Sequence, residues 1–193
     1  MFESENLLPN GGEVFLEDLD LQQNYFEILK DKIAWKQDEI KIYGKTHLVP
    51  RLTAWYGTKS YTYSKIINQP LGWTKELLEL KKLAEEESAK LGYKIEFNSV
   101  LLNYYRDGQD SIGYHSDDEK ELGTNPVIAS FSFGETRIFS FRHKVTKEIV
   151  KLELQNNTFL LMAGETQSNW EHQISKTAKL KNGRINLTFR NIL

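Results

Sequence analysis

The chain has 193 residues, of which 39% are hydrophobic and 27% are charged, and its formal net charge is −2 at pH 7. These values are typical of one well-cored globular domain with room for a small lid. The absence of cysteine excludes disulfides, thiolate metal ligands and a cysteine nucleophile, and no apolar run approaches the roughly 20 residues that cross a membrane.

Two helices are predicted in the first half of the chain. Residues 19–33 carry an apolar repeat of about 3.6 residues, which is typical of an amphipathic helix. Residues 74–91 carry a second such repeat. Thr74 is a suitable N-cap for this second helix, and Gly92 is well placed to end it.

Most of the remaining chain is predicted to form strands. The expected strands cover residues 40–43, 61–63, 97–105, 127–133, 137–141, 148–154, 158–162 and 184–192. Turn signals at Gly44-Lys45 and Asp107-Gly108 separate some of them. Two helices followed by many short strands predict a single α+β, mainly β domain over residues 1–193, with a two-sheet core of the jelly-roll kind.

A possible metal site is formed by His115, Asp117 and His172. His115 and Asp117 are two residues apart, so a strand would place both on one face. His172 can approach them on an expected strand near Trp170–Ile174. Two imidazoles and one carboxylate can hold one face of Fe(II), and Mn(II) or Zn(II) accept the same donors. The alternative is a surface histidine beside a solvated carboxylate.

The end of the chain alternates polar and apolar residues. A strand would therefore turn Arg184, Asn186, Thr188 and Arg190 to one side. Two arginines on a buried strand are costly unless they are paired with anions. A dicarboxylic cosubstrate beside the metal would satisfy both, because a guanidinium binds a carboxylate bidentately. The alternative is that both arginines pair with carboxylates of the protein.

Charged residues are unevenly distributed along the chain. Acidic residues gather at 85–87 and 117–119, and basic residues at 142–144 and at Lys176, Lys179 and Lys181. The net charge does not favour nonspecific nucleic-acid binding, because neutralising phosphates requires Lys and Arg. A basic face on one side of the molecule nevertheless remains open.

The motifs together form the pattern Asn103-x-Tyr105, His115-x-Asp117, His172 and Arg184-x-Asn186-x-Thr188-x-Arg190. This pattern resembles the AlkB family of Fe(II)/2-oxoglutarate dioxygenases, over roughly residues 40–193. Segments 103–144 and 184–193 are most similar to the double-strand-preferring DNA-repair members. The resemblance implies a double-stranded β-helix core over about residues 95–193. N-terminal helices and a nucleotide-recognition lid would occupy about residues 1–94.

The resemblance also implies the chemistry of the site. His115, Asp117 and His172 would bind Fe(II) and form the catalytic centre. The cosubstrate 2-oxoglutarate would be held by Asn103, Tyr105, Arg184, Asn186 and Arg190. With O2, such an enzyme decarboxylates 2-oxoglutarate to succinate and hydroxylates an N-methyl group, which leaves as formaldehyde. The implied reaction is direct repair of 1-methyladenine and 3-methylcytosine in DNA.

Further residues resemble substrate contacts of the family. Tyr63, with Tyr61 beside it, would contact a base flipped out of the helix, and Arg51 belongs to the same segment. Asp118 and Glu119 would accept hydrogen bonds from the exocyclic amine of adenine or cytosine. The alternatives are ordinary strand packing for the tyrosines and a solvated acidic turn for the carboxylates.

Duplex binding is implied by two other segments. Tyr43, at the tip of an expected hairpin, resembles a wedge that fills the gap left by a flipped base. Arg142 and Lys144 resemble a segment that grips phosphates. The tip is alternatively a plain hairpin, and the loop after Lys144 is short, so single-stranded DNA or RNA remains open as substrate.

Two other functions compete with DNA repair. One is an AlkB-like RNA demethylase, and the other is a non-catalytic jelly-roll module that only binds nucleic acid. The complete His-Asp-His set and both arginines weigh against the binding module. The expected partner is alkylated DNA, duplex or single-stranded, with RNA as the alternative. We expect no membrane partner, a monomer, and an intracellular location, cytoplasmic in a bacterium and nuclear in a eukaryote.

Overall fold

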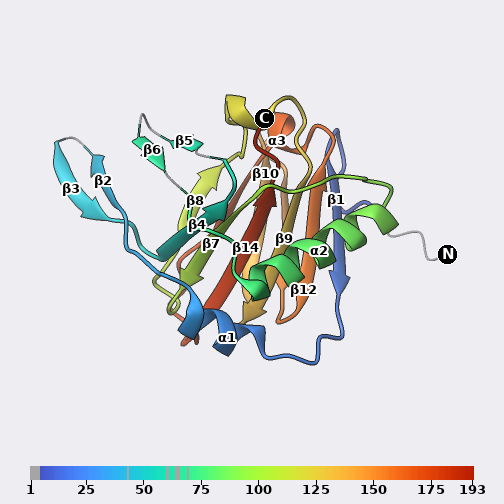
Figure 1. Ribbon diagram of the computed structural model, residues 1–193. Coiled ribbons are helices and arrows are strands. Elements are labelled where there is room, and N and C mark those ends of the chain that lie inside the picture. Colours follow the sequence, from blue (N-terminus) through green and yellow to red (C-terminus); the bar gives the residue numbers. More distant parts are fainter. Residues whose placement is uncertain (1–4, 43, 60, 64–65, 69) are drawn as a thin grey trace.

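Two antiparallel sheets form the core of the computed structural model, which describes residues 5–42, 44–59, 61–63, 66–68 and 70–193 (Figure 1). The six-stranded major sheet has the order β1 (Glu13–Asp18), β12 (Thr158–Ala163), β9 (Ile128–Gly134), β14 (Arg184–Arg190), β7 (Ser99–Tyr105) and β4 (Leu52–Gly57). The four-stranded minor sheet has the order β11 (Ile149–Leu154), β10 (Arg137–His143), β13 (Trp170–Ile174) and β8 (Ile112–His115). The predicted jelly-roll core is confirmed.

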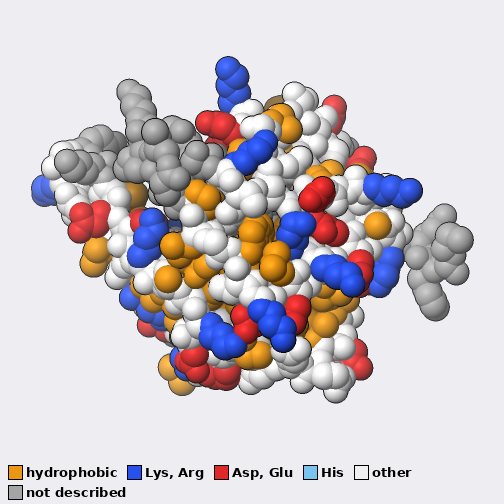
Figure 2. Space-filling model, viewed as in Figure 1, with side chains coloured by type: hydrophobic (Ala, Val, Ile, Leu, Met, Phe, Trp, Pro, Cys, Tyr) orange, Lys and Arg blue, Asp and Glu red, His pale blue; other side chains and the backbone are white. Residues whose placement is uncertain are grey.

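The helices cover the outer face of the major sheet, as Figure 1 shows. They are α1 (Tyr25–Lys32) and α2 (Lys75–Lys90); a short α3 (Thr166–Asn169) and a 3-10 turn (Lys120–Leu122) lie in connections. Buried Leu29 and Leu77 belong to the same apolar cluster as Phe131 and Phe189 of the sheet. On the solvent side, Figure 2 shows Lys and Arg intermixed with Asp and Glu, as expected for a helix with charge pairs along its exposed face.

The second predicted helix is confirmed, and the first is shorter than predicted. Thr74 caps α2 by accepting a hydrogen bond from the Leu77 amide, and Gly92 follows the helix with φ of +94°. The first helix begins only after Asn24, whose side chain accepts a hydrogen bond from the Glu27 amide. Asparagine favours a cap over a helix interior because its side chain competes for backbone groups. The apolar residues before it pack on the core without being helical.

Sequence patterning did not predict the two edge strands of the major sheet. β1 and β4 both precede residue 95, in the segment that was assigned to N-terminal helices and lid. β4 is buried on both faces from Thr53 to Gly57, so its sequence does not alternate between polar and apolar residues. No helix among the described residues is long and apolar enough to span a membrane.

Two hairpins project from the N-terminal segment beyond the edge of the sheets (Figure 1). One pairs β2 (Glu39–Ile42) with β3 (Lys45–Leu48), and the other pairs β5 (Tyr61–Tyr63) with β6 (Ile66–Asn68). The strands predicted at 40–43 and 61–63 belong to these hairpins. The other predicted strands are present, with ends displaced by up to two residues.

Alternation in β14 connects the fold to the site. The side chains of Ile185, Leu187 and Phe189 are fully buried in the cluster beneath the helices. The polar residues of the same strand face the opposite way and line a cavity between the sheets. One strand therefore supplies both a hydrophobic core face and a polar binding face, as the period of two requires.

Candidate metal and cosubstrate site

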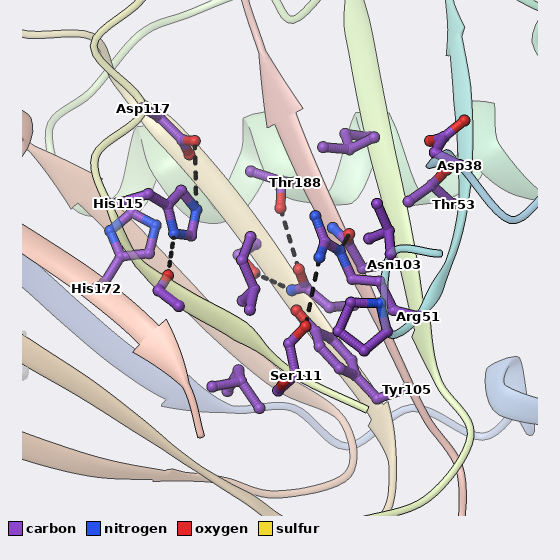
Figure 3. A pocket seen from close by; sticks show the side chains of 18 of the residues that line it. Asp38, Arg51, Thr53, Asn103, Tyr105, Ser111, His115, Asp117, His172 and Thr188 are labelled. Atoms are coloured by element: carbon purple, nitrogen blue, oxygen red, sulfur yellow. Dashed lines mark hydrogen bonds and ion pairs between the residues drawn. The ribbon is translucent and has the colours of Figure 1, made fainter. Parts of the chain in front are cut away.

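Three candidate metal ligands converge at one end of the cavity (Figure 3). His115 ends β8, Asp117 follows it by two residues, and His172 lies within β13. The two strands pair with His115 directly opposite His172. One potential ligand atom from each residue lies within 4.8 Å of the others. The structure thus brings together the three residues predicted to bind metal.

The two histidines differ in their surroundings, and buried His172 is in the neutral form that a metal requires. Burial, together with the nearby His115, lowers the pKa of His172 to about 3, although Asp117 acts in the opposite direction. The imidazole of His172 is therefore neutral at pH 7, and its Nδ1 is buried without a hydrogen-bond partner among the described residues. The Nδ1 of His115 donates to the Gly113 carbonyl at 2.9 Å, which leaves Nε2 on the side of Asp117, at 3.9 Å.

Asp117 is a buried carboxylate held in its ionised form. Burial alone would raise the pKa of Asp117, but the positive charge of Arg190 is the main influence that lowers it, to about 2, with smaller contributions from the neighbouring imidazoles. Arg190 contacts the carboxylate at 2.8 Å. The Asp117 amide donates to the side chain of Gln167 at 2.9 Å, which further orients the residue. Arg190 therefore pairs with a carboxylate of the protein, which is the alternative given above for the two arginines of the last strand.

Arg184 differs from Arg190 because it has no carboxylate partner among the described residues. Its guanidinium is fully buried and donates to the Ser132 hydroxyl at 2.7 Å, while its Nε has no hydrogen-bond partner there. Burial lowers the pKa of Arg184 to about 10, so the group remains charged at pH 7. A buried cation of this kind requires an anion. The structure therefore has a place for a carboxylate beside Arg184.

Three further polar side chains, Tyr105, Asn103 and Arg51, lie between Arg184 and the lid segment. Tyr105 pairs with Arg184 in the sheet register, and its ring centroid is 5.4 Å from the guanidinium. Burial raises the pKa of Tyr105, so the phenol keeps its proton and can donate it in a hydrogen bond. Asn103 pairs with Asn186 in the next row, and its Oδ1 accepts from the Nε of Arg51 at 2.7 Å. The side-chain Nδ2 of Asn186 donates to the Ser130 hydroxyl at 2.6 Å.

The cavity that contains these groups has a volume of about 650 Å³. Eleven of the predicted site residues line it: Arg51, Asn103, Tyr105, His115, Asp117, Asp118, Glu119, His172, Arg184, Asn186 and Arg190. The Oε2 of Glu119 is buried without a hydrogen-bond partner in the described part of the chain. Arg51 approaches Asn103 and the Ser111 carbonyl, so it connects the lid segment to the cosubstrate side of the cavity.

Among the remaining predicted substrate contacts, Arg142 and Lys144 are described, and neither lines this cavity. Arg142 pairs with Glu171 at 2.6 Å and lies over the Tyr114 ring, and Lys144 donates to the Gln167 carbonyl at 2.8 Å. Lys144 also approaches Asp118 at 3.5 Å, so it lies near the acidic rim. Both cations are thus engaged with protein groups. The side chains of Tyr61 and Tyr63, and all of Tyr43, lie outside the described residues.

Some polar residues of the site were not predicted from the sequence. Ser130 and Ser132 hold Asn186 and Arg184, and their alternation with phenylalanine in β9 was an available signal. Asp38 accepts a hydrogen bond from Thr53 at 2.6 Å at the lid side of the cavity. No local pattern indicates this second contact, because it depends on a backbone bridge between Lys36 and Thr53.

Known proteins with similar sequences identify the family. The profile of the 2OG-Fe(II) oxygenase superfamily matches residues 13–190. The alpha-ketoglutarate-dependent dioxygenase alkB homolog 3 of Bos taurus is 42% identical over 185 residues, which cover 91% of this chain and 63% of the relative. The DNA oxidative demethylase ALKBH2 of Bos taurus is 40% identical over 164 residues, which cover 80% of this chain and 57% of the relative. The chain belongs to the AlkB family.

This AlkB-family chain therefore spans about 60% of the length of those relatives. Among solved structures, OsALKBH1 matches with a TM-score of 0.57 and 19% identity, over 81% of each chain. A similarity at that level of identity supports the fold alone. The sheet order and this structural similarity confirm the predicted jelly-roll architecture. The sequence matches confirm the predicted family.

The cofactors of the family, Fe(II), 2-oxoglutarate and O2, fit the residues of this site. A neutral His172, a His115 with Nε2 available and an ionised Asp117 are suitable donors for Fe(II). The buried Arg184 guanidinium and the Tyr105 phenol suit a carboxylate of the cosubstrate. When bound, the iron and the cosubstrate together supply oxidising chemistry with O2.

Proposed function

We propose that this AlkB-family chain demethylates N-alkylated bases in DNA, with release of formaldehyde and conversion of 2-oxoglutarate to succinate. The observation that carries this proposal is the convergence of His115, Asp117 and His172 within 4.8 Å, in the same cavity as the buried Arg184. A module that only binds nucleic acid has no need for this combination. The names of the relatives, a dioxygenase and a DNA oxidative demethylase, support the proposal.

The residues of the chain would divide the work as follows. Asp117 stays ionised because Arg190 contacts it, so it holds a metal charge without first losing a proton. Arg184 and Tyr105 would orient the cosubstrate by binding a carboxylate in the buried part of the cavity. Phe139 and Ile174 contribute apolar walls near the histidines, which would keep water away from the reacting groups.

Base recognition would involve the acidic rim. Asp118 and Glu119 line the cavity, and the buried Oε2 of Glu119 has no hydrogen-bond partner among the described residues. A carboxylate oxygen in that state favours a donor from the substrate. The exocyclic amines of 1-methyladenine and 3-methylcytosine are such donors, so these lesions are the proposed substrates. Each base would have to leave the helix to enter.

We propose single-stranded DNA as the better substrate form. Arg142 and Lys144, which the resemblance assigned to phosphate gripping, are engaged with Glu171 and the Gln167 carbonyl. The connection that follows them is short, with β11 beginning at Ile149. These observations do not favour a strong grip on a second strand. A monomer acting inside the cell, with no membrane partner, remains part of the proposal.

The test is formaldehyde release from a panel of oligonucleotides. The panel compares 1-methyladenine and 3-methylcytosine in single-stranded DNA, duplex DNA and RNA of the same sequence, with Fe(II) and 2-oxoglutarate. We expect release from DNA, equal amounts of succinate, and none from a His172→Ala variant. Release from RNA alone would replace the proposal with the RNA demethylase. Binding without release from any member would support a non-catalytic module.

A further inference from the structure

A second cavity lies on the outer face of the minor sheet. Residues alternate along its strands, so His115 and His172 face the metal site while Tyr114 and Gln173 face away from it. The outer cavity has a volume of about 520 Å³ and receives side chains from β8, β10, β11 and β13 and from the segment after β13. It shares no lining residue with the cavity that holds the candidate metal ligands. We call it the outer groove.

The outer groove is rich in positive charge. Lys151, Lys176 and Lys179 line it, are exposed, and form no ion pair among the described residues. Lys181 also lines it but is paired with Glu135 at 2.9 Å. Glu153 is the only carboxylate that the described lining contains. A chain with a formal net charge of −2 therefore concentrates unpaired cations in one groove, which favours a polyanion.

Flat and apolar groups adjoin these lysines. Ile138 and Ile149 line the groove and are 42% and 52% exposed. The Arg142 guanidinium lies 3.9 Å from the centre of the Tyr114 ring and is held there by Glu171. Bases of a single strand can stack on such planar or apolar groups while their phosphates meet the lysines. A duplex keeps its bases stacked inside and cannot use these surfaces.

The outer groove and the first cavity lie on the two faces of strand β8. β8 is an edge strand of the minor sheet, and its Ile112 and Gly113 line the first cavity while Tyr114 lines the outer groove. In the described part of the chain, no heavy atom beyond Gly113 and its two chain neighbours lies within 4 Å of the position that a Cβ atom would take at Gly113. A nucleic-acid strand that leaves the first cavity across β8 at Gly113 would therefore reach the outer groove on the other face of that strand.

We propose that the outer groove binds the phosphate backbone of single-stranded nucleic acid. The argument for binding in the groove rests on its unpaired lysines and its exposed planar and apolar groups. Its use for the nucleotides that flank a base in the active site rests on the proposed demethylase function. Held in this way, a long single strand gains contacts that a short one lacks, so the groove would favour substrates long enough to reach around β8.

The test compares two variants that each lose three positive charges. The groove variant is Lys151→Gln, Lys176→Gln and Lys179→Gln. The control is Lys75→Gln, Lys82→Gln and Lys90→Gln, which changes exposed lysines of α2 on the other side of the molecule. The probe is a fluorescent unmethylated DNA strand of about 16 nucleotides. Its affinity is measured by anisotropy across a range of salt concentrations, without iron or 2-oxoglutarate.

We expect the groove variant to bind on the order of 10-fold more weakly at low salt. Its slope of log affinity against log salt should be smaller by about 2, because each phosphate contact with a single strand contributes about 0.7. The control should keep the original slope. Equal loss in both variants, or no loss in the groove variant, would overturn the proposal. Displacement of the probe by polyglutamate at equal charge would assign the groove to acidic protein segments instead.

Failure of this proposal is distinguishable from failure of the demethylase function. The binding measurement needs no turnover, so a groove effect without formaldehyde release would remove only the proposed function. Formaldehyde release without a groove effect would remove only the outer groove. For an active enzyme, the groove variant should raise KM for the long methylated strand and leave KM for a methylated trinucleotide unchanged.

Discussion

At the scale of single residues, the negative charge of Asp117 both pairs with Arg190 and belongs to the candidate metal site. Arg190 contacts the Oδ1 of its carboxylate at 2.8 Å, and the Nε2 of His115 lies 3.9 Å from the same oxygen. A buried arginine and a buried carboxylate each cost free energy alone, and together they offset much of that cost. The pair also holds the carboxylate in place before any metal arrives. Metal affinity and the stability of this corner are therefore linked through one side chain.

Replacing Asp117 with alanine should sharply reduce metal affinity. Outer partners of metal ligands are worth about 10- to 100-fold in affinity, so loss of a direct ligand should cost at least about 100-fold. Titration calorimetry with Mn(II) in place of Fe(II) measures the change without oxidation. Asp118→Ala, which removes the neighbouring exposed carboxylate, is the matched control. Equal Mn(II) affinity in the two variants would show that Asp117 is not a ligand.

Replacing Arg184 with glutamine tests the cosubstrate site. Glutamine keeps a donor for Ser132 but lacks the positive charge, so a bound carboxylate loses a charge-assisted hydrogen bond. We expect KM for 2-oxoglutarate to rise on the order of 10-fold or more, with a smaller change in kcat. Ser132→Ala removes only the hydroxyl and should raise KM less. An unchanged KM in Arg184→Gln would move the cosubstrate carboxylate elsewhere.

At the scale of elements, the edge strand β1 is fastened through a side-chain contact. Tyr93, which lies between α2 and β7, donates a hydrogen bond to Glu13 at the start of β1, and its ring packs near Phe15. Burial and the hydrogen bond to Glu13 raise the pKa of Tyr93 to about 12. The contact requires the phenol to keep its proton. The attachment of β1 through Tyr93 should therefore weaken when the phenol loses its proton at strongly alkaline pH.

The free energy of unfolding should fall as pH rises from about 10 to about 12. The unfolded chain releases the Tyr93 proton near pH 10, whereas the folded chain keeps it to about 12. The stabilisation from this group is therefore complete below pH 10 and is lost across that interval. Denaturant unfolding at several pH values measures the slope. Tyr93→Phe should have a smaller slope, and an identical slope would exclude Tyr93 as its cause.

At the scale of the whole molecule, the site exists only where the two sheets and the lid segment meet. The first cavity is lined from β4, β7, β9, β12 and β14 of the major sheet, from β8, β10 and β13 of the minor sheet, and from the segment around Asp38. Ligands bound there contact both sheets and should stabilise the folded state relative to the unfolded chain.

Mn(II) and 2-oxoglutarate together should raise Tm. At about 100 times Kd, binding stabilises the folded state by about 2.7 kcal/mol, which corresponds to roughly 5–10 °C for a chain of this size. Scanning calorimetry with and without the ligands measures the shift, and EDTA should return Tm to the starting value. The Asp117→Ala variant should show little response. An equal shift in that variant would locate the stabilising ligand outside the three-residue site.

Local sequence determined the elements whose pattern is contained within a few residues. The cap at Thr74 and the stripe through Leu77 and Leu80 define α2, because helix caps and a 3.6-residue period are local signals. The alternation in β14 determined that Arg184 and Arg190 share a face. The donor chemistry of His115, Asp117 and His172 was also readable from their residue types, and the two-residue spacing of His115 and Asp117 placed those two on one face.

Only the tertiary structure decided which of these groups became partners. It paired Arg190 with Asp117 and left Arg184 with Ser132, a distinction that no spacing along the chain contains. The tertiary structure also placed β1 and β4 at the edges of the major sheet. It brought Lys151 close to Lys176 and Lys179 in the outer groove. The physical reason is that sheet order and register join residues far apart in sequence, and these contacts depend on the whole chain folding at once.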